Sequence, residues 1–96
     1  MDMQEALTIL SRHREELQAA GVKSLAVFGS LSRGEATAAS DIDLLVEFSR
    51  PVGLLAFIRL RQWLTEILGR RVDLVTPKAL RPAWRERILG EARHAV

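Results

Sequence analysis

The feature that most constrains the fold is a pair of short apolar runs with a polar segment between them, and this segment carries a distinct motif at each of its ends. The first run, residues 25–28, ends at Gly29-Ser30, and the second, residues 44–46, begins directly after Asp41-Ile42-Asp43. Short apolar runs bounded in this way are typical of buried strands. We therefore place both polar motifs at strand ends and expect them to lie close together.

The aspartates are spaced for metal binding. Residues two apart in a strand point to the same face, so Asp41 and Asp43 project together while Ile42 points into the core. Two carboxylates on one face repel each other unless a positive charge lies between them. Magnesium prefers oxygen ligands and usually binds through one or two carboxylates together with substrate phosphates. The spacing predicts a divalent metal site at this strand.

The Gly29-Ser30 turn is suited to phosphate. Glycine lets the backbone approach a phosphate closely, and a serine hydroxyl with neighbouring N–H groups can donate to its oxygens. Arg33, the only cation of residues 30–40, could contact a triphosphate tail or an acceptor. The alternative for Arg33 is an ion pair with Glu35 or Glu47. Together with the aspartates, the turn indicates metal-assisted chemistry on a nucleoside triphosphate.

A third carboxylate lies in the middle of another expected strand. Residues 71–76 (RVDLVT) are apolar enough for a buried strand, and burying the charge of Asp73 alone would cost several kcal/mol, on the order of a lost buried ion pair. If this strand lies beside that of Asp41 and Asp43, Asp73 can share their ion and activate an attacking hydroxyl. The alternative is an ion pair of Asp73 with Arg70, Arg71 or another nearby arginine.

These residues resemble a known family. The segments 29–36 (GSLSRGEA), 40–48 (SDIDLLVEF) and 72–77 (VDLVTP) are similar to the minimal nucleotidyltransferases (MNT) of the DNA polymerase beta-like nucleotidyltransferase superfamily. The resemblance implies an α/β fold whose core is a small three-stranded mixed sheet flanked by helices. It also implies that Asp41, Asp43 and Asp73 are the catalytic, metal-binding carboxylates and that Gly29 and Ser30 hold the triphosphate.

The resemblance further implies an activity and a partner. Many MNT proteins are antitoxins encoded beside a HEPN-domain toxin, and some transfer AMP from ATP to a tyrosine of that toxin. We therefore expect a magnesium-dependent adenylyltransferase with two Mg²⁺ ions, ATP as substrate and a HEPN toxin as partner. The chain has no tyrosine, so a tyrosine acceptor must belong to another protein.

Two alternatives come from other functional classes. The protein could be a binding module that neutralises the toxin by complex formation, or an enzyme that adds nucleotides to RNA. Residues 50–96 carry ten basic and four acidic side chains, whereas residues 1–49 carry four and eight. A basic half can attract RNA or an acidic protein. With five aromatic residues, all Phe or Trp in apolar settings, the sequence gives no RNA-stacking platform, so we do not expect direct nucleic-acid binding.

Composition indicates one nucleotidyltransferase domain over residues 1–96. The chain is 48% hydrophobic and 27% charged and has no cysteine, which is ordinary for a soluble globular domain and excludes thiolate metal sites. Its longest apolar run, residues 52–58, is too short to span a bilayer, and no signal peptide is evident. We expect a cytoplasmic protein without membrane contact.

Three helices complete the expected order. One runs from a capping box at Asp2 and Glu5 to Gly21, and a second, broad and apolar, runs from Gly53 to Gly69. The third begins around Ala83. Its expected buried residues are Trp84, Ile88, Leu89 and Ala92.

Overall fold

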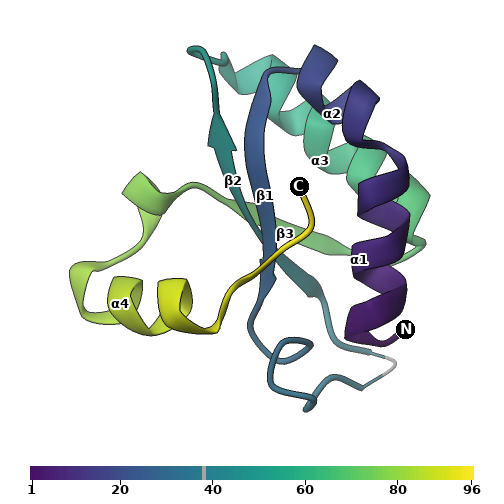
Figure 1. Ribbon diagram of the computed structural model, residues 1–96. Helices are drawn as coiled ribbons and strands as arrows, with labels where there is room; N and C mark the ends of the chain where they lie inside the picture. Colours follow the sequence, from purple (N-terminus) through teal and green to yellow (C-terminus); the bar gives the residue numbers. More distant parts are fainter. Residues whose placement is uncertain (38) are drawn as a thin grey trace.

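A mixed sheet of four strands, in the order β3-β2-β1-β4, forms the centre of the computed structural model, which describes residues 1–37 and 39–96 (Figure 1). Strand β1 (Val22–Phe28) pairs antiparallel with β2 (Ile42–Phe48), and β2 pairs in parallel with β3 (Val72–Val75). The expected α/β fold with a small mixed sheet is confirmed, but the expected number of three strands is wrong.

The additional strand is β4 (Arg93–His94), which pairs antiparallel with the free edge of β1. Two residues of arginine and histidine have no apolar alternation, so the sequence pattern gives no sign of a strand here. The pairing extends into the C-terminal residues, where the Ala95 N–H donates to the Leu25 carbonyl over 2.8 Å. The end of the chain thus closes the edge of β1.

The sheet buries apolar side chains on both faces. Alternate residues of β1 and β2, among them Val27 and Leu44, belong to the larger core under the N-terminal helices and α3 (Leu54–Leu68). The residues between them, Ala26, Phe28 and Leu45, form a second, smaller cluster. Because side chains alternate along a strand, the two clusters lie on opposite faces of the sheet.

The first expected helix is divided into two, α1 (Met3–Arg12) and α2 (Arg14–Ala19), and this corrects the prediction of one continuous helix. Asp2 caps α1, since its Oδ1 accepts from the Glu5 N–H over 2.8 Å. The break falls at His13, whose ring lies edge-on to Trp63 with 5.3 Å between ring centroids. A contact with a residue fifty positions away cannot be inferred from helical periodicity.

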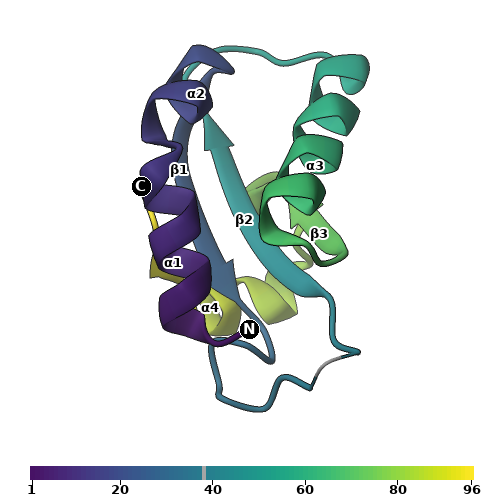
Figure 2. The same cartoon turned by 90° about the vertical axis from the view of Figure 1, so that its right-hand side faces the viewer.

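Helix α3 packs on the larger core through Leu60, Leu64 and Leu68. It ends at Gly69, which adopts φ +67°, as a helix C-terminus commonly requires. Figure 2 shows α1 and α3 side by side on one face of the sheet, with α4 (Pro82–Glu91) on the other. Of the helices in residues 1–37 and 39–96, none is long and apolar enough to cross a membrane.

Helix α4 follows a short 3-10 turn, η1 (Pro77–Ala79), and rests on the smaller cluster. Ile88 and Ala92 are partly buried there. Trp84 and Leu89, however, are 51% and 47% exposed, so half of the expected buried side of this helix is wrong. The cluster beneath α4 is small, and only one edge of the helix reaches it.

Candidate functional site

Strand register brings two of the predicted carboxylates together. In the parallel pair of β2 and β3, Asp43 lies opposite Asp73, and in the antiparallel pair of β1 and β2 it lies opposite Phe28. Directly opposed residues share a face, so both aspartates point to the face of the smaller cluster and α4. Asp41 comes two residues before Asp43, immediately before β2 begins. Asp43 and Asp73 therefore share one end of one sheet face, and Asp41 lies just outside the strand at the same end.

Gly29 lies in close contact with Asp43, so the turn and the aspartates are near each other, as the sequence predicts. It follows β1 directly and adopts φ +74°, a conformation that L side chains rarely adopt. A methyl group in place of its Cα hydrogen would overlap the Asp43 carboxylate. The Arg33 N–H donates to the Gly29 carbonyl over 3.1 Å and the Glu35 N–H to the Ser30 carbonyl over 2.8 Å. These bonds fold residues 29–35 into a tight series of turns beside the aspartates.

Arg33 lies in this turn and is held by two glutamates. Its Nε donates to Glu35 over 3.2 Å, and its Nη1 donates to both carboxylate oxygens of Glu91 over 3.1 and 3.2 Å. The alternative reading of an ion pair with Glu35 is confirmed, whereas no ion pair with Glu47 is found among the described residues. Contact of Arg33 with nucleotide stays a prediction.

Glu91 is the residue that sequence analysis missed. Besides Arg33, its Oε1 accepts from the Gly29 N–H over 3.2 Å, and its backbone carbonyl accepts from the Ser32 hydroxyl over 2.6 Å. Its side chain is 18% exposed. The residue ends α4, 62 positions after Gly29. α4 carries two arginines and two glutamates, and the sequence gives no local signal that one of these glutamates reaches a distant turn.

Electrostatics at the site disfavour the ionised form of Asp43. Burial, the neighbouring charge of Asp73 and then that of Asp41 raise the pKa of Asp43 from 3.8 to about 6. The negative charge of Glu91 acts in the same direction, and the positive charge of Arg33 opposes it. Like charges gathered on one face are unfavourable without a cation to balance them.

Two consecutive arginines before β3 contact the segment that leads into β2. Arg70 Nη2 donates to the Ser40 carbonyl over 2.6 Å and to the Thr37 carbonyl over 2.9 Å. Arg71 lies 3.9 Å from Asp41, as a loose and exposed pair. Neither arginine pairs with Asp73, and the described residues contain no ion pair of Asp73, so that alternative reading is wrong.

The donor set of the site fits magnesium. Asp41, Asp43 and Asp73 offer only carboxylate oxygens, which is the ligand type of Mg²⁺. Burial, and after it the charges of Asp73 and Asp41, raises the pKa of Asp43, and a bound cation would favour its ionised form. As the side chains are placed in residues 1–37 and 39–96, no three acidic, histidine or cysteine side chains are close enough to hold a metal ion together. Metal binding therefore stays a prediction.

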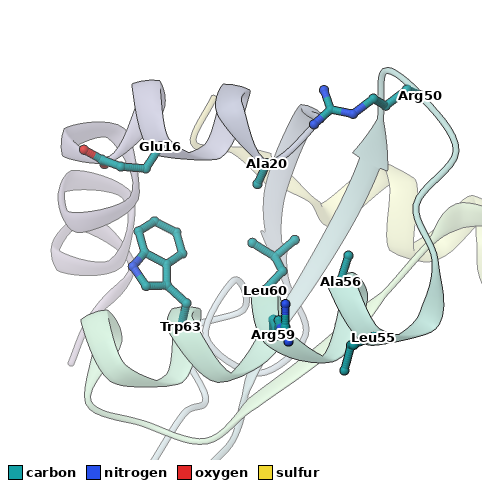
Figure 3. A pocket seen from close by; sticks show the side chains of 8 residues that line it. All are labelled: Glu16, Ala20, Arg50, Leu55, Ala56, Arg59, Leu60 and Trp63. Carbon is teal, nitrogen blue, oxygen red and sulfur yellow. The ribbon is translucent and has the colours of Figure 1, made fainter.

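A hollow of about 570 Å³ lies away from these carboxylates, between α2 and α3 (Figure 3). Trp63 and Leu60 from α3 line it, together with Glu16 and Ala20, and Arg50 stands at its rim. This hollow is on the larger-core side of the sheet, whereas the aspartates and Gly29 are at the other face. It is separate from the candidate site.

A small mixed sheet that holds carboxylates against a glycine-serine turn is the arrangement that resemblance to nucleotidyltransferases implies. Residues 10–94 match the nucleotidyltransferase domain family, and the chain belongs to that family. The chain is 41% identical over 92 residues to the protein adenylyltransferase MntA of Thermococcus cleftensis, which covers 95% of this chain and 93% of that protein.

Solved structures agree with this assignment. A chain described as a "putative minimal nucleotidyltransferase" superposes with a TM-score of 0.75 at 41% identity, over 97% of this chain and 95% of that one. A chain from a crystal structure of the toxin-antitoxin MntA-HpeT superposes with a TM-score of 0.67 at 25% identity, over 91% of this chain and 68% of that one. The minimal nucleotidyltransferase fold is thereby shown for this chain.

Proposed function

We propose that this protein is a magnesium-dependent antitoxin that transfers AMP from ATP to a tyrosine hydroxyl of a HEPN-domain toxin. The observation that carries the proposal is the convergence of Asp43, Asp73 and Gly29, in which register and close contact bring carboxylates beside a phosphate-approach turn. The relatives add support for the reaction and partner, since one is named a protein adenylyltransferase and another comes from a toxin-antitoxin structure.

The phosphate donors in this proposal are on the turn after β1. The Gly29 N–H, the Ser30 hydroxyl and the Arg33 guanidinium would bind the β- and γ-phosphates. Gly29 is suited to this because the absence of a side chain leaves room for Asp43 and a phosphate on either side of the backbone. The positive charge of Arg33 would balance phosphate charge as pyrophosphate leaves.

The carboxylates would serve the metal and the acceptor. Asp41, Asp43 and Asp73 would hold Mg²⁺, which when bound neutralises phosphate charge and orients the α-phosphate for in-line attack. Asp73, which is exposed at the open side of β3, would accept the proton of the tyrosine hydroxyl. The phenolic oxygen forms a bond to the α-phosphorus, and the bond from that phosphorus to the pyrophosphate oxygen breaks.

The test compares wild type with Asp43→Asn. Intact-mass measurement of the co-purified HEPN toxin, after incubation with ATP and Mg²⁺, should show added adenylyl groups with wild type and none with the variant. Peptide mapping should place them on tyrosine. Co-purification should show that the variant still binds the toxin, which separates lost transfer from lost folding.

The outcome also decides between catalysis and simple binding. If Asp43→Asn protects cells from the toxin as well as wild type does, the protein neutralises by complex formation and the catalytic proposal fails. Glu47→Gln, a charge removal on an exposed residue of the same strand, is the matched control and should retain both transfer and protection.

A further inference from the structure

Two of the three donors expected to bind nucleotide phosphates already have an anionic partner in the structure. The Gly29 N–H and the Arg33 Nη1 both donate to the Glu91 carboxylate, over 3.2 and 3.1 Å. The second Glu91 oxygen accepts from the same guanidinium group over 3.2 Å. A carboxylate with two acceptor oxygens thus occupies the place where the preceding proposal puts phosphate oxygens.

A phosphate and this carboxylate cannot both satisfy the same donors. One backbone N–H makes one good hydrogen bond, and a guanidinium binds a carboxylate or a phosphate through the same fork of donors. Glu91 also adds negative charge beside Asp43. A triphosphate at Gly29 would therefore meet both a competing acceptor and an unfavourable charge as long as Glu91 stays in place.

The helix that carries Glu91 is weakly held. No residue of α4 is fully buried, and the helix contacts the sheet only through partly buried residues such as Ile88 and, just after its end, Ala92. The pairing of β4 with β1 holds the chain that follows the helix, not the helix itself. The hydrogen bond from the Ser32 hydroxyl to the Glu91 carbonyl, at 2.6 Å, is a further local attachment. Few buried apolar contacts mean that little free energy opposes movement of such a segment.

We propose that Glu91 stands in for the nucleotide's phosphates when no nucleotide is bound, and that it must leave Gly29 and Arg33 before the triphosphate can bind. The inference rests on the proposed function, because it takes the same turn to be the phosphate site. Glu91 then lowers the apparent nucleotide affinity by the fraction of molecules in which it is bound to the turn. In the absence of nucleotide it keeps Arg33 ordered and the turn closed.

The opposite role makes the opposite prediction. If Glu91 positioned Arg33 for the nucleotide, its removal would leave Arg33 disordered and would weaken binding. If Glu91 competes with the nucleotide, its removal frees the donors and strengthens binding. The sign of the change in affinity therefore decides between them.

The experiment measures the dissociation constant of ATP with Mg²⁺ by calorimetry for wild type, Glu91→Ala and Glu91→Gln. Glu91→Ala should bind about tenfold more tightly, which is the gain expected if the carboxylate occupies the turn in roughly nine molecules of ten. Glu91→Gln, which keeps an acceptor but loses the charge, should fall between wild type and Glu91→Ala. The matched control is Glu86→Ala, which removes an exposed charge from the same helix and should bind like wild type.

A second measurement follows the helix itself. Hydrogen exchange of residues 82–94 in wild type should become faster when inorganic tripolyphosphate is added, because the anion displaces Glu91 and releases the end of α4. In the Glu91→Ala variant, hydrogen exchange of residues 82–94 should be fast without any added anion, and tripolyphosphate should not change it.

Unchanged or weaker binding by Glu91→Ala overturns the inference, and so does an equal gain in Glu86→Ala, since that would be a general effect of charge. These results leave the proposed function intact as long as wild type binds ATP. If neither wild type nor any variant binds ATP, the proposed function itself fails, and the inference fails with it.

Discussion

At the scale of the residue, the site contains a charge that destabilises the metal-free fold. Burial and the charges of Asp73 and Asp41 raise the pKa of Asp43 from 3.8 to about 6. Between these two pH values the folded protein binds more protons at Asp43 than the unfolded chain does, so its stability falls as pH rises through this window. Above pH 6 the full cost of the ionised carboxylate is present.

Asp43→Asn should therefore stabilise the metal-free protein at pH 8. The free energy of unfolding should rise by about 1 kcal/mol, after allowance for the solvent around a half-exposed group. At pH 3.5 the gain should vanish, because the wild-type carboxyl is then protonated in the folded state as well. Urea unfolding with a chelator present, at both pH values, measures the difference.

Glu47→Gln, on an exposed part of the same strand, is the control for this experiment and should show no such gain. A stabilisation by Asp43→Asn that is equal at pH 8 and pH 3.5 would contradict the electrostatic account. It would show that the amide packs better than the carboxyl for reasons unrelated to charge.

At the scale of the element, the entry into β2 is fixed from the start of β3. Arg70 binds the carbonyls of Thr37 and Ser40, directly before Asp41. The Ile42 N–H also donates to the Arg71 carbonyl over 2.8 Å, which begins the parallel ladder. The position of Asp41 thus depends on a residue that follows it by some thirty positions.

Arg70→Ala should lower the free energy of unfolding by about 1–2 kcal/mol, because two carbonyls lose a charged donor. It should also slow AMP transfer, since the backbone before Asp41 is no longer held. Arg70→Lys, with one point charge instead of a planar fork, should recover only part of both. Urea unfolding and the transfer rate measure these effects.

Arg61 of α3 is exposed, and its replacement by alanine is the matched control for Arg70→Ala. Arg61→Ala should change stability by less than about 0.5 kcal/mol and leave the transfer rate unchanged. If Arg70→Ala were as mild as Arg61→Ala, the two hydrogen bonds of Arg70 would not be what positions Asp41.

In the molecule as a whole, the sheet separates the main hydrophobic core from the candidate site. The face under α1 and α3 contains the larger core, whereas the opposite face carries Asp43, Asp73 and the smaller cluster beneath α4. Substrate binding should therefore add stability without rearranging the main core. Since α4 has no buried residue, it is the element that we expect to move when substrate binds.

ATP with Mg²⁺ should raise the melting temperature of wild type. At a ligand concentration one hundred times the dissociation constant, the added stability is about 2.7 kcal/mol, which in a domain of this size is roughly 10 °C or more. Asp43→Asn should show little of this shift, and ATP with a chelator should give little with either protein. Thermal scans with and without ligand test it, and an equal shift in both proteins would place nucleotide binding elsewhere.

Strands β1, β2 and β3 and the motifs at their ends could be predicted from local pattern, whereas the expectation of an α/β fold with a small mixed sheet came from the family resemblance. Period-two alternation assigns Asp43 to one face and Leu44 to the other. Asp73 is exposed in the structure, so the burial cost expected for its charge does not arise. Pairing of β2 with β3 then brings the two aspartates together. The division at His13 and the exposure of Trp84 were not predictable, because they depend on which distant element each residue meets.

Backbone periodicity and residues adjacent in the chain were enough to specify strands β1, β2 and β3, the Gly29 turn and the face on which Asp43 lies. Only the tertiary structure decided that Glu91 reaches Gly29 and Arg33 and that β4 closes the edge of β1. Those contacts join residues about sixty positions apart. They exist only once α4 has packed on the sheet, and hydrophobic pattern specifies that a helix forms but not where its end will lie.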